Sequence, residues 1–140
     1  MYLFDRVTIV GLGLVGGSLG LALRRQRLAR EVVGWSRRQA TLRQAKASGA
    51  IDWGTTDLRR AVADADLVVL AVPVDVIVPL GLRAARHMKP GSLLTDVGST
   101  KEGIVHALER RLPAGVAFVG AHPLAGSERR GIHAARRSLY

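Results

Sequence analysis

The 140-residue chain contains no cysteine. This absence excludes a disulfide framework, a zinc ribbon, an iron–sulfur cluster and a cysteine nucleophile. Any redox chemistry must therefore depend on a cofactor that the chain binds.

Long hydrophobic runs are also missing, although 48% of the residues are hydrophobic. Apolar stretches such as 67–74 end in proline or charge well before the ~18 residues that a membrane-spanning helix needs. Residues 1–6 lack the basic segment and apolar core of a secretory signal. We therefore expect a cytoplasmic protein without a membrane partner. A chain of this length can bury one core, so we also expect a single domain.

Lysine is scarce: of the 21 basic residues, only Lys46, Lys89 and Lys101 are lysines and the others are arginines. The formal net charge is +10. Such an excess attracts phosphate at long range and raises the possibility of a nucleic-acid partner. Aromatic residues, at 4%, are too few to supply stacking platforms for single strands. The arginines also occur in pairs on amphipathic segments, which is typical of solvated helix faces. We therefore expect no nucleic-acid partner.

Short β-branched runs alternate along the chain with segments of helical periodicity. Strands are predicted over 6–10, 31–35, 51–54, 67–72, 92–96 and 116–120. Helices are predicted over 15–23, 39–48, 57–63, 74–88 and 100–112. Strands that alternate with helices form a parallel sheet covered on both faces. The sequence therefore predicts a doubly wound α/β domain of the Rossmann type.

A Gly-x-Gly-x-x-Gly pattern joins the first predicted strand to the first predicted helix. Gly11 allows a tight turn, Gly13 leaves room for a pyrophosphate, and Gly16 lets the helix approach the strand closely. The amides around Leu14 and Val15 would then face the phosphates at the positive end of the helix dipole. The pattern alone is weak, but its place between strand and helix favours a dinucleotide site.

The residues after the second strand indicate which dinucleotide binds. An NAD site usually has Asp or Glu there, which accepts hydrogen bonds from the ribose 2′-hydroxyl. This chain has Ser36, Arg37 and Arg38 instead. A serine hydroxyl and a guanidinium suit a 2′-phosphate, so NADP is favoured over NAD. The alternative is that both arginines merely begin a solvated helix.

Ligands of open α/β sheets bind beyond the carboxyl ends of the strands. Val72 and Pro73 follow the fourth strand and are candidates for a wall beside the nicotinamide. Ser99 follows the fifth strand, near Asp96, and places a hydroxyl at the mouth of the crevice. With Glu102 three residues later, Ser99 also fits a capping box for the next helix.

His122 follows the sixth strand and is the strongest candidate for a general base. The unperturbed pKa of histidine, about 6.5, suits proton transfer near neutral pH. His87 and His106 lie within predicted helices beside polar neighbours, and His133 lies in a basic tail. We expect these three to be surface residues.

Three segments together resemble the prephenate and arogenate dehydrogenases of tyrosine biosynthesis. They read GLGLVGGS at 11–18, DVGSTK at 96–101 and HPLAGSE at 122–128. The second and third segments are far more specific than the glycine pattern, and the resemblance extends over residues 6 to about 135. It implies an NAD(P)-dependent oxidative decarboxylation that requires no metal.

The resemblance also implies roles for individual residues. His122 would take the proton from the ring 4-hydroxyl while hydride leaves C4 for the nicotinamide. Ser99 would orient that hydroxyl and His122. Glu128 matches an acidic residue near the substrate entrance, and Lys101 belongs to the second motif as a further substrate-site candidate.

Members of the family continue into a helical domain that forms a homodimer and anchors a substrate carboxylate. We therefore expect residues 1–140 to be the dinucleotide-binding half. Other Rossmann dehydrogenases, such as the β-hydroxyacid type, share the glycine turn but not the segment at 122–128. A nucleotide-sensing domain without chemistry is a further alternative. The choice between prephenate and arogenate stays open.

Overall fold

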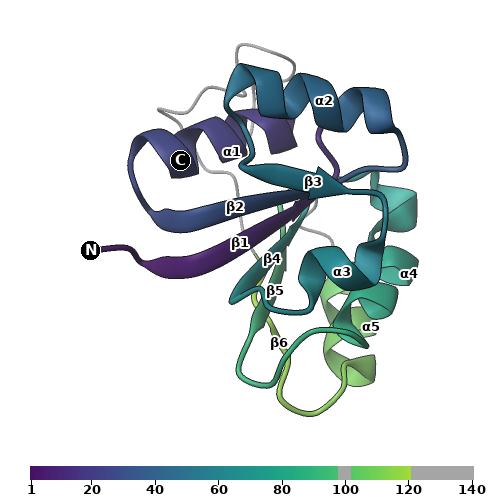
Figure 1. Ribbon diagram of the computed structural model, residues 1–140. Helices are drawn as coiled ribbons and strands as arrows, with labels where there is room; N and C mark the ends of the chain where they lie inside the picture. Colours follow the sequence, from purple (N-terminus) through teal and green to yellow (C-terminus); the bar gives the residue numbers. More distant parts are fainter. Residues whose placement is uncertain (98–101, 121–140) are drawn as a thin grey trace.

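The computed structural model describes residues 1–97 and 102–120, which form one six-stranded sheet with helices on both faces (Figure 1). The strands are β1 (Phe4–Val10), β2 (Ala29–Trp35), β3 (Trp53–Thr55), β4 (Leu67–Leu70), β5 (Leu93–Asp96) and β6 (Ala117–Phe118). The helices are α1 (Leu14–Arg25), α2 (Gln39–Ser48), α3 (Leu58–Val62), α4 (Val74–Ala85) and α5 (Glu102–Arg111). The predicted α/β fold is confirmed.

All strand pairs are parallel, in the order β3-β2-β1-β4-β5-β6. The chain builds outward from β1 to β3, then returns to pair β4 with the other side of β1. Figure 1 shows α1 and α2 on one face of the sheet and α3, α4 and α5 on the other. The strand order reverses between β1 and β4, and ligands of such sheets bind at this point, beyond the carboxyl ends of the strands.

Strand β1 separates the two hydrophobic cores because its side chains alternate between the faces. Val7 and Ile9 pack with residues of α1 and α2, whereas Val10 packs with residues of α3 and α4. Thr8 is polar and buried on the α3 side, where its hydroxyl donates a 2.5 Å hydrogen bond to the Ala61 carbonyl. A hydroxyl satisfied in this way is compatible with the core.

Every predicted strand and helix is present, and its bounds lie within two residues of the predicted ones, except that α4 ends at Ala85 and not at residue 88. Helix α2 has the predicted bounds, and Gly49 ends it in the left-handed region at φ +87°. The third strand, predicted over 51–54, is Trp53–Thr55. Ile51 is buried instead in the core beside α1 and α2, while Asp52 accepts a hydrogen bond from the Val32 amide. These two residues therefore attach to β2 without extending the ladder.

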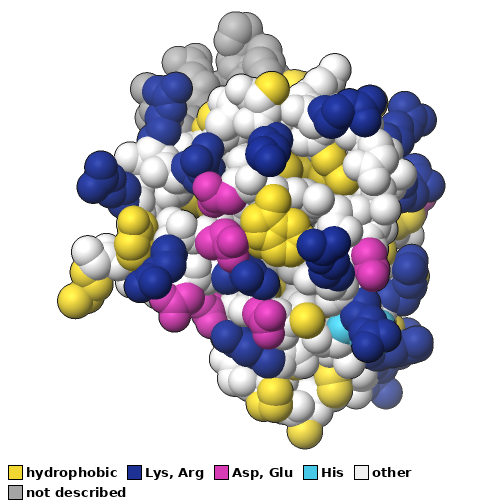
Figure 2. Space-filling view, in the orientation of Figure 1, with side chains coloured by type: hydrophobic (Ala, Val, Ile, Leu, Met, Phe, Trp, Pro, Cys, Tyr) yellow, Lys and Arg dark blue, Asp and Glu magenta, His cyan; other side chains and the backbone are white. Residues whose placement is uncertain are grey.

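Basic side chains are distributed over the face shown in Figure 2, where they surround a group of acidic side chains. His87 and His106 are exposed, as predicted; His133 lies outside the described residues. None of the helices in the described residues has the length and apolar character needed to cross a membrane.

Asp66 joins three segments at the amino ends of the strands. Its carboxylate accepts hydrogen bonds from the amides of Asp5 and Arg6 at 2.8 and 3.0 Å, and pairs with Lys89 Nζ at 2.8 Å. The hydrogen bond from Lys89 is the main cause that lowers the pKa of Asp66, and the two amides lower it further against the opposing effect of burial. The ionised carboxylate therefore stabilises the folded chain.

We expect Asp66→Asn to lower the free energy of unfolding at pH 7 by about 1–3 kcal/mol, because amides and an ammonium lose their charged acceptor. The folded pKa lies below the unfolded value of about 3.9, so this contribution is complete above that pH and declines as pH falls through the folded pKa. Urea unfolding at several pH values measures both effects. Asp64→Asn, at an exposed carboxylate 3.6 Å from Arg6, is the matched control and should change stability little. A constant difference between wild type and Asp66→Asn down to pH 3 would contradict the assignment.

Candidate functional site at the carboxyl edge of the sheet

The turn after β1 connects the carboxyl ends of three strands. Gly11 adopts φ +101°, a conformation that favours glycine, and its amide donates to the Trp35 carbonyl at the end of β2 over 3.0 Å. A Cβ on Gly11 would lie 2.4 Å from the Ala71 carbonyl oxygen that follows β4. No larger residue fits this turn without moving the strand ends.

Gly16 allows α1 to pack directly on that turn. A Cβ at this position would lie 2.0 Å from the Gly11 carbonyl oxygen and 3.2 Å from Cγ2 of Ile9. The backbone of the first helical turn is thus in contact with the backbone of the glycine loop. This contact sets the direction of α1 and hence the direction in which its amides point.

The beginning of α1 fits an anionic group. Gly13 is the N-cap and makes no side-chain cap hydrogen bond, and the first turn contains no acidic residue. Among the described residues, no atom outside the two chain neighbours lies within 4 Å of the place where a Cβ of Gly13 would stand. The first amides of a helix carry partial positive charge and need acceptors. The amides of Leu14 and Val15 can therefore hold a phosphate that approaches over Gly13.

A pocket of about 430 Å³ lies beside this turn, between the end of β2 and the start of α4. It brings together Arg37, Val72 and Pro73, which the sequence suggested separately. Ser36 is next to the pocket, and its hydroxyl accepts a 3.2 Å hydrogen bond from the Arg38 amide. Arg38 does not line the pocket, so the structure separates the two arginines that the sequence treated alike.

Two charged residues of this pocket, Asp75 and Arg83, were not predicted from the sequence. Both lie on α4, where the pocket-lining residues Asp75, Val76, Pro79, Leu80 and Arg83 recur at helical spacing. That spacing could have indicated a common face. It did not show that this face borders the end of β2, because α4 and β2 are distant in the sequence and come together only in the tertiary structure.

In the sequence, the proposed catalytic segments follow β5 and β6. Asp96 ends β5 and is 1% exposed, and the Val97 amide donates to the Leu70 carbonyl over 3.2 Å. Thr95 Oγ1 donates to the Val119 carbonyl, which connects β5 with the residues after β6. Ser99, Lys101, His122 and Glu128 lie outside the described residues.

Residues 19–140 match the family described as prephenate dehydrogenase, nucleotide-binding domain. The chain belongs to the prephenate dehydrogenase family. The match begins after the glycine turn. The turn itself is of a kind shared by many dinucleotide-binding proteins.

Relatives and solved structures of this family resemble the chain over nearly its whole length. Prephenate dehydrogenase from Bacillus subtilis is 34% identical over 97% of the chain and 37% of the relative. Cyclohexadienyl dehydrogenase from Zymomonas mobilis is 32% identical over 100% of the chain and 47% of the relative. The chain thus spans less than half the length of these curated relatives.

The structure of prephenate dehydrogenase from A. aeolicus with hydroxyphenyl propionate and NAD+ has a TM-score of 0.82 and 32% identity, over 97% of this chain and 47% of that chain. Synechocystis arogenate dehydrogenase has a TM-score of 0.79 and 33% identity, over 94% of this chain and 45% of that chain. 3-Hydroxyisobutyrate dehydrogenase from Salmonella typhimurium, at 22% identity over 81% of this chain and 40% of that chain, with a TM-score of 0.68, shares the fold alone.

Gly16 and Gly17 offer a matched test of the helix contact. Gly16→Ala should destabilise the chain by about 1–3 kcal/mol and weaken dinucleotide binding, because the new methyl group overlaps the Gly11 carbonyl. Apart from its chain neighbours and the backbone of α1, no atom in residues 1–97 and 102–120 lies within 4 Å of the Cβ position of Gly17. Gly17→Ala should therefore stabilise α1 by roughly 0.5–1 kcal/mol. Thermal unfolding of both variants measures the difference, and equal stability would refute the proposed contact.

Proposed function

We propose that the protein containing this chain oxidises prephenate or arogenate with NAD(P)+, and that residues 1–140 form the dinucleotide-binding domain. The supporting observation is the uncapped start of α1 above the glycine turn, at the point where the strand order reverses. In such sheets the dinucleotide crosses this point with its pyrophosphate at the helix N-terminus. The solved relative from A. aeolicus contains NAD+.

We further propose that the pocket beside Arg37 receives the adenosine half and prefers NADP+ over NAD+. Arg37 is exposed and has no ion pair with an acidic residue in the described ranges, so its guanidinium is available to a phosphate. Val72, Pro73 and Pro79 supply apolar walls for a base. Arg83 adds a second positive charge, whereas Asp75 adds a negative charge that would oppose a nearby phosphate.

Calorimetric titration of the chain with NADP+ and NAD+ tests this preference. We expect Arg37→Ala to weaken NADP+ binding about tenfold or more and to change NAD+ binding little, because only NADP+ carries the 2′-phosphate. Arg43→Ala removes an exposed arginine of α2 outside the pocket and is the charge-matched control. Tighter binding of NAD+ together with an unchanged NADP+ affinity in Arg37→Ala would refute the preference.

The chemistry that we propose depends on the segments outside the described residues. When bound, NAD(P)+ would supply the acceptor for the hydride that leaves C4 of the substrate ring. His122 takes the proton of the 4-hydroxyl, and the loss of CO2 then makes the ring aromatic. Ser99 orients the hydroxyl, while Lys101 and Glu128 contact the substrate. The homodimer stays a prediction from the family resemblance. The cytoplasmic location stays a prediction from the sequence pattern of residues 1–6 and of the apolar stretches.

His122→Asn tests the base, in the protein at its natural length. Asparagine keeps similar size and some hydrogen bonding but cannot take the proton, so kcat should fall roughly 10²-fold or more. The Kd of the dinucleotide should stay within about twofold, because His122 is not assigned to its binding. His106→Asn, at an exposed histidine of α5, is the control. Turnover of prephenate and arogenate, followed as NAD(P)H absorbance, gives kcat; a near-normal value would eliminate His122 as the base.

A further inference from the structure

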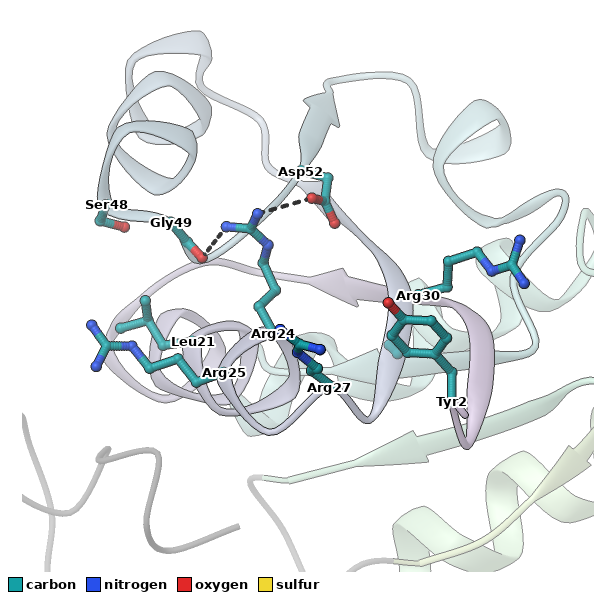
Figure 3. Close-up of a pocket in the computed structure, with 10 residues that line it drawn as sticks. Tyr2, Leu21, Arg24, Arg25, Arg27, Arg30, Ser48, Gly49 and Asp52 are labelled. Carbon is teal, nitrogen blue, oxygen red and sulfur yellow. Dashed lines mark hydrogen bonds and ion pairs between the residues drawn. The ribbon is translucent and has the colours of Figure 1, made fainter.

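A pocket of about 570 Å³ lies at the amino ends of the strands, on the edge opposite the glycine turn. Its wall contains four arginines, Arg24, Arg25, Arg27 and Arg30, together with Tyr2 (Figure 3). We call this the arginine pocket. It borders the last turn of α1, whose 12 residues separate it from the glycine turn by roughly 18 Å.

One of the four arginines is held in place by the fold. Arg24 donates to the Gly49 carbonyl over 2.6 Å and pairs with Asp52 Oδ1 at 3.1 Å. The other oxygen of Asp52 accepts the Val32 amide over 2.7 Å. Both carboxylate oxygens of the acidic residue in this pocket are therefore engaged, and Arg24 forms a fixed wall.

The other three arginines keep most of their charge uncompensated. Arg25 and Arg27 make no ion pair within the described ranges, and Arg30 approaches Asp5 only at 3.7 Å. Figure 3 shows Arg25 and Arg30 on opposite sides of the pocket, with Arg24 and Arg27 between them. The positive charge is thus spread along the pocket rather than gathered at one point.

The backbone of Arg27 sets this residue apart from the other exposed arginines. It has φ +55°, and every other described residue with positive φ is a glycine, namely Gly11, Gly49, Gly91 and Gly115. The amides of Arg27 and Leu28 donate to the carbonyls of Arg24 and Leu23, the pattern of a helix end that favours glycine. A bulky side chain here is unfavourable for stability.

We propose that the arginine pocket binds a small elongated anion with two or more phosphate groups, at a site separate from the glycine turn. One guanidinium group can donate two parallel hydrogen bonds to the oxygens of a phosphate. Because the arginines are spread along the pocket, they suit a chain of linked phosphates better than a single phosphate. The carbonyls at the end of α1 oppose an anion weakly, because those of Ala22, Leu23 and Arg24 already accept amides. Phosphate binding by the Arg27 side chain would then offset the cost in stability of its left-handed backbone conformation.

Inorganic tripolyphosphate at physiological ionic strength is the probe, and NMR spectra of the whole chain report the site. We expect the side-chain signals of Arg25, Arg27 and Arg30 to shift with a single Kd. Signals from residues 11–17 report separately on the glycine turn, so the experiment tests binding at the two sites independently. Shifts confined to residues 11–17 would overturn the arginine pocket and leave the proposed function untouched.

Arg27→Gly provides the sharpest variant. We expect it to raise Tm, since glycine suits the left-handed backbone, and to weaken tripolyphosphate binding about fivefold or more. Arg25→Gln should weaken binding similarly without raising Tm. Arg59→Gln removes the same charge from α3, outside the pocket, and should leave Kd within about twofold.

Three outcomes would overturn the proposal. Arg59→Gln could weaken binding as much as Arg25→Gln, which would mean that only net charge attracts the probe. Arg27→Gly could raise Tm without any change in Kd. Hexaglutamate could bind as tightly as tripolyphosphate, which would make the surface a site for acidic peptide rather than for phosphate.

Discussion

Gly16 stands where α1 meets the loop after β1, and the distance between the two backbones leaves no room for a side chain. The direction of α1 depends on this contact, and so does the direction of its first amides. The same loop holds the ends of β1 and β2 together through the hydrogen bond from Gly11 to Trp35. The phosphate site that we propose at the start of α1 depends on this arrangement.

The amino edge of the sheet is held together differently, by carboxylates that accept backbone amides. Asp66 accepts two amides at the start of β1, and Asp52 accepts the Val32 amide within β2. Each carboxylate also pairs with a cation, Lys89 or Arg24. At this edge, individual backbone amides have no partner on a neighbouring strand. The two carboxylates accept these amides in place of a strand carbonyl.

The arginines of this chain do not act as one class. Arg6 and Arg24 pair with acidic residues and stabilise the sheet edge. Arg37 lines the pocket next to the glycine turn, while Arg27 occupies a backbone position typical of glycine. The arginines among the described residues therefore stand in different local environments.

The sequence alone determined the alternation of strands and helices, the glycine turn and the family, because these depend on local periodicity and on short motifs. The end of α2 was also predictable, since Gly49 supplies the left-handed residue that stops a helix. Tertiary structure decided the edge of β3, where burial of Ile51 and the carboxylate of Asp52 outweighed strand propensity. It also decided which strand-end residues share a site. Arg37 meets Val72 and Arg83 only because the chain returns from β3 to place β4 beside β1, and no local pattern contains the position of that crossover.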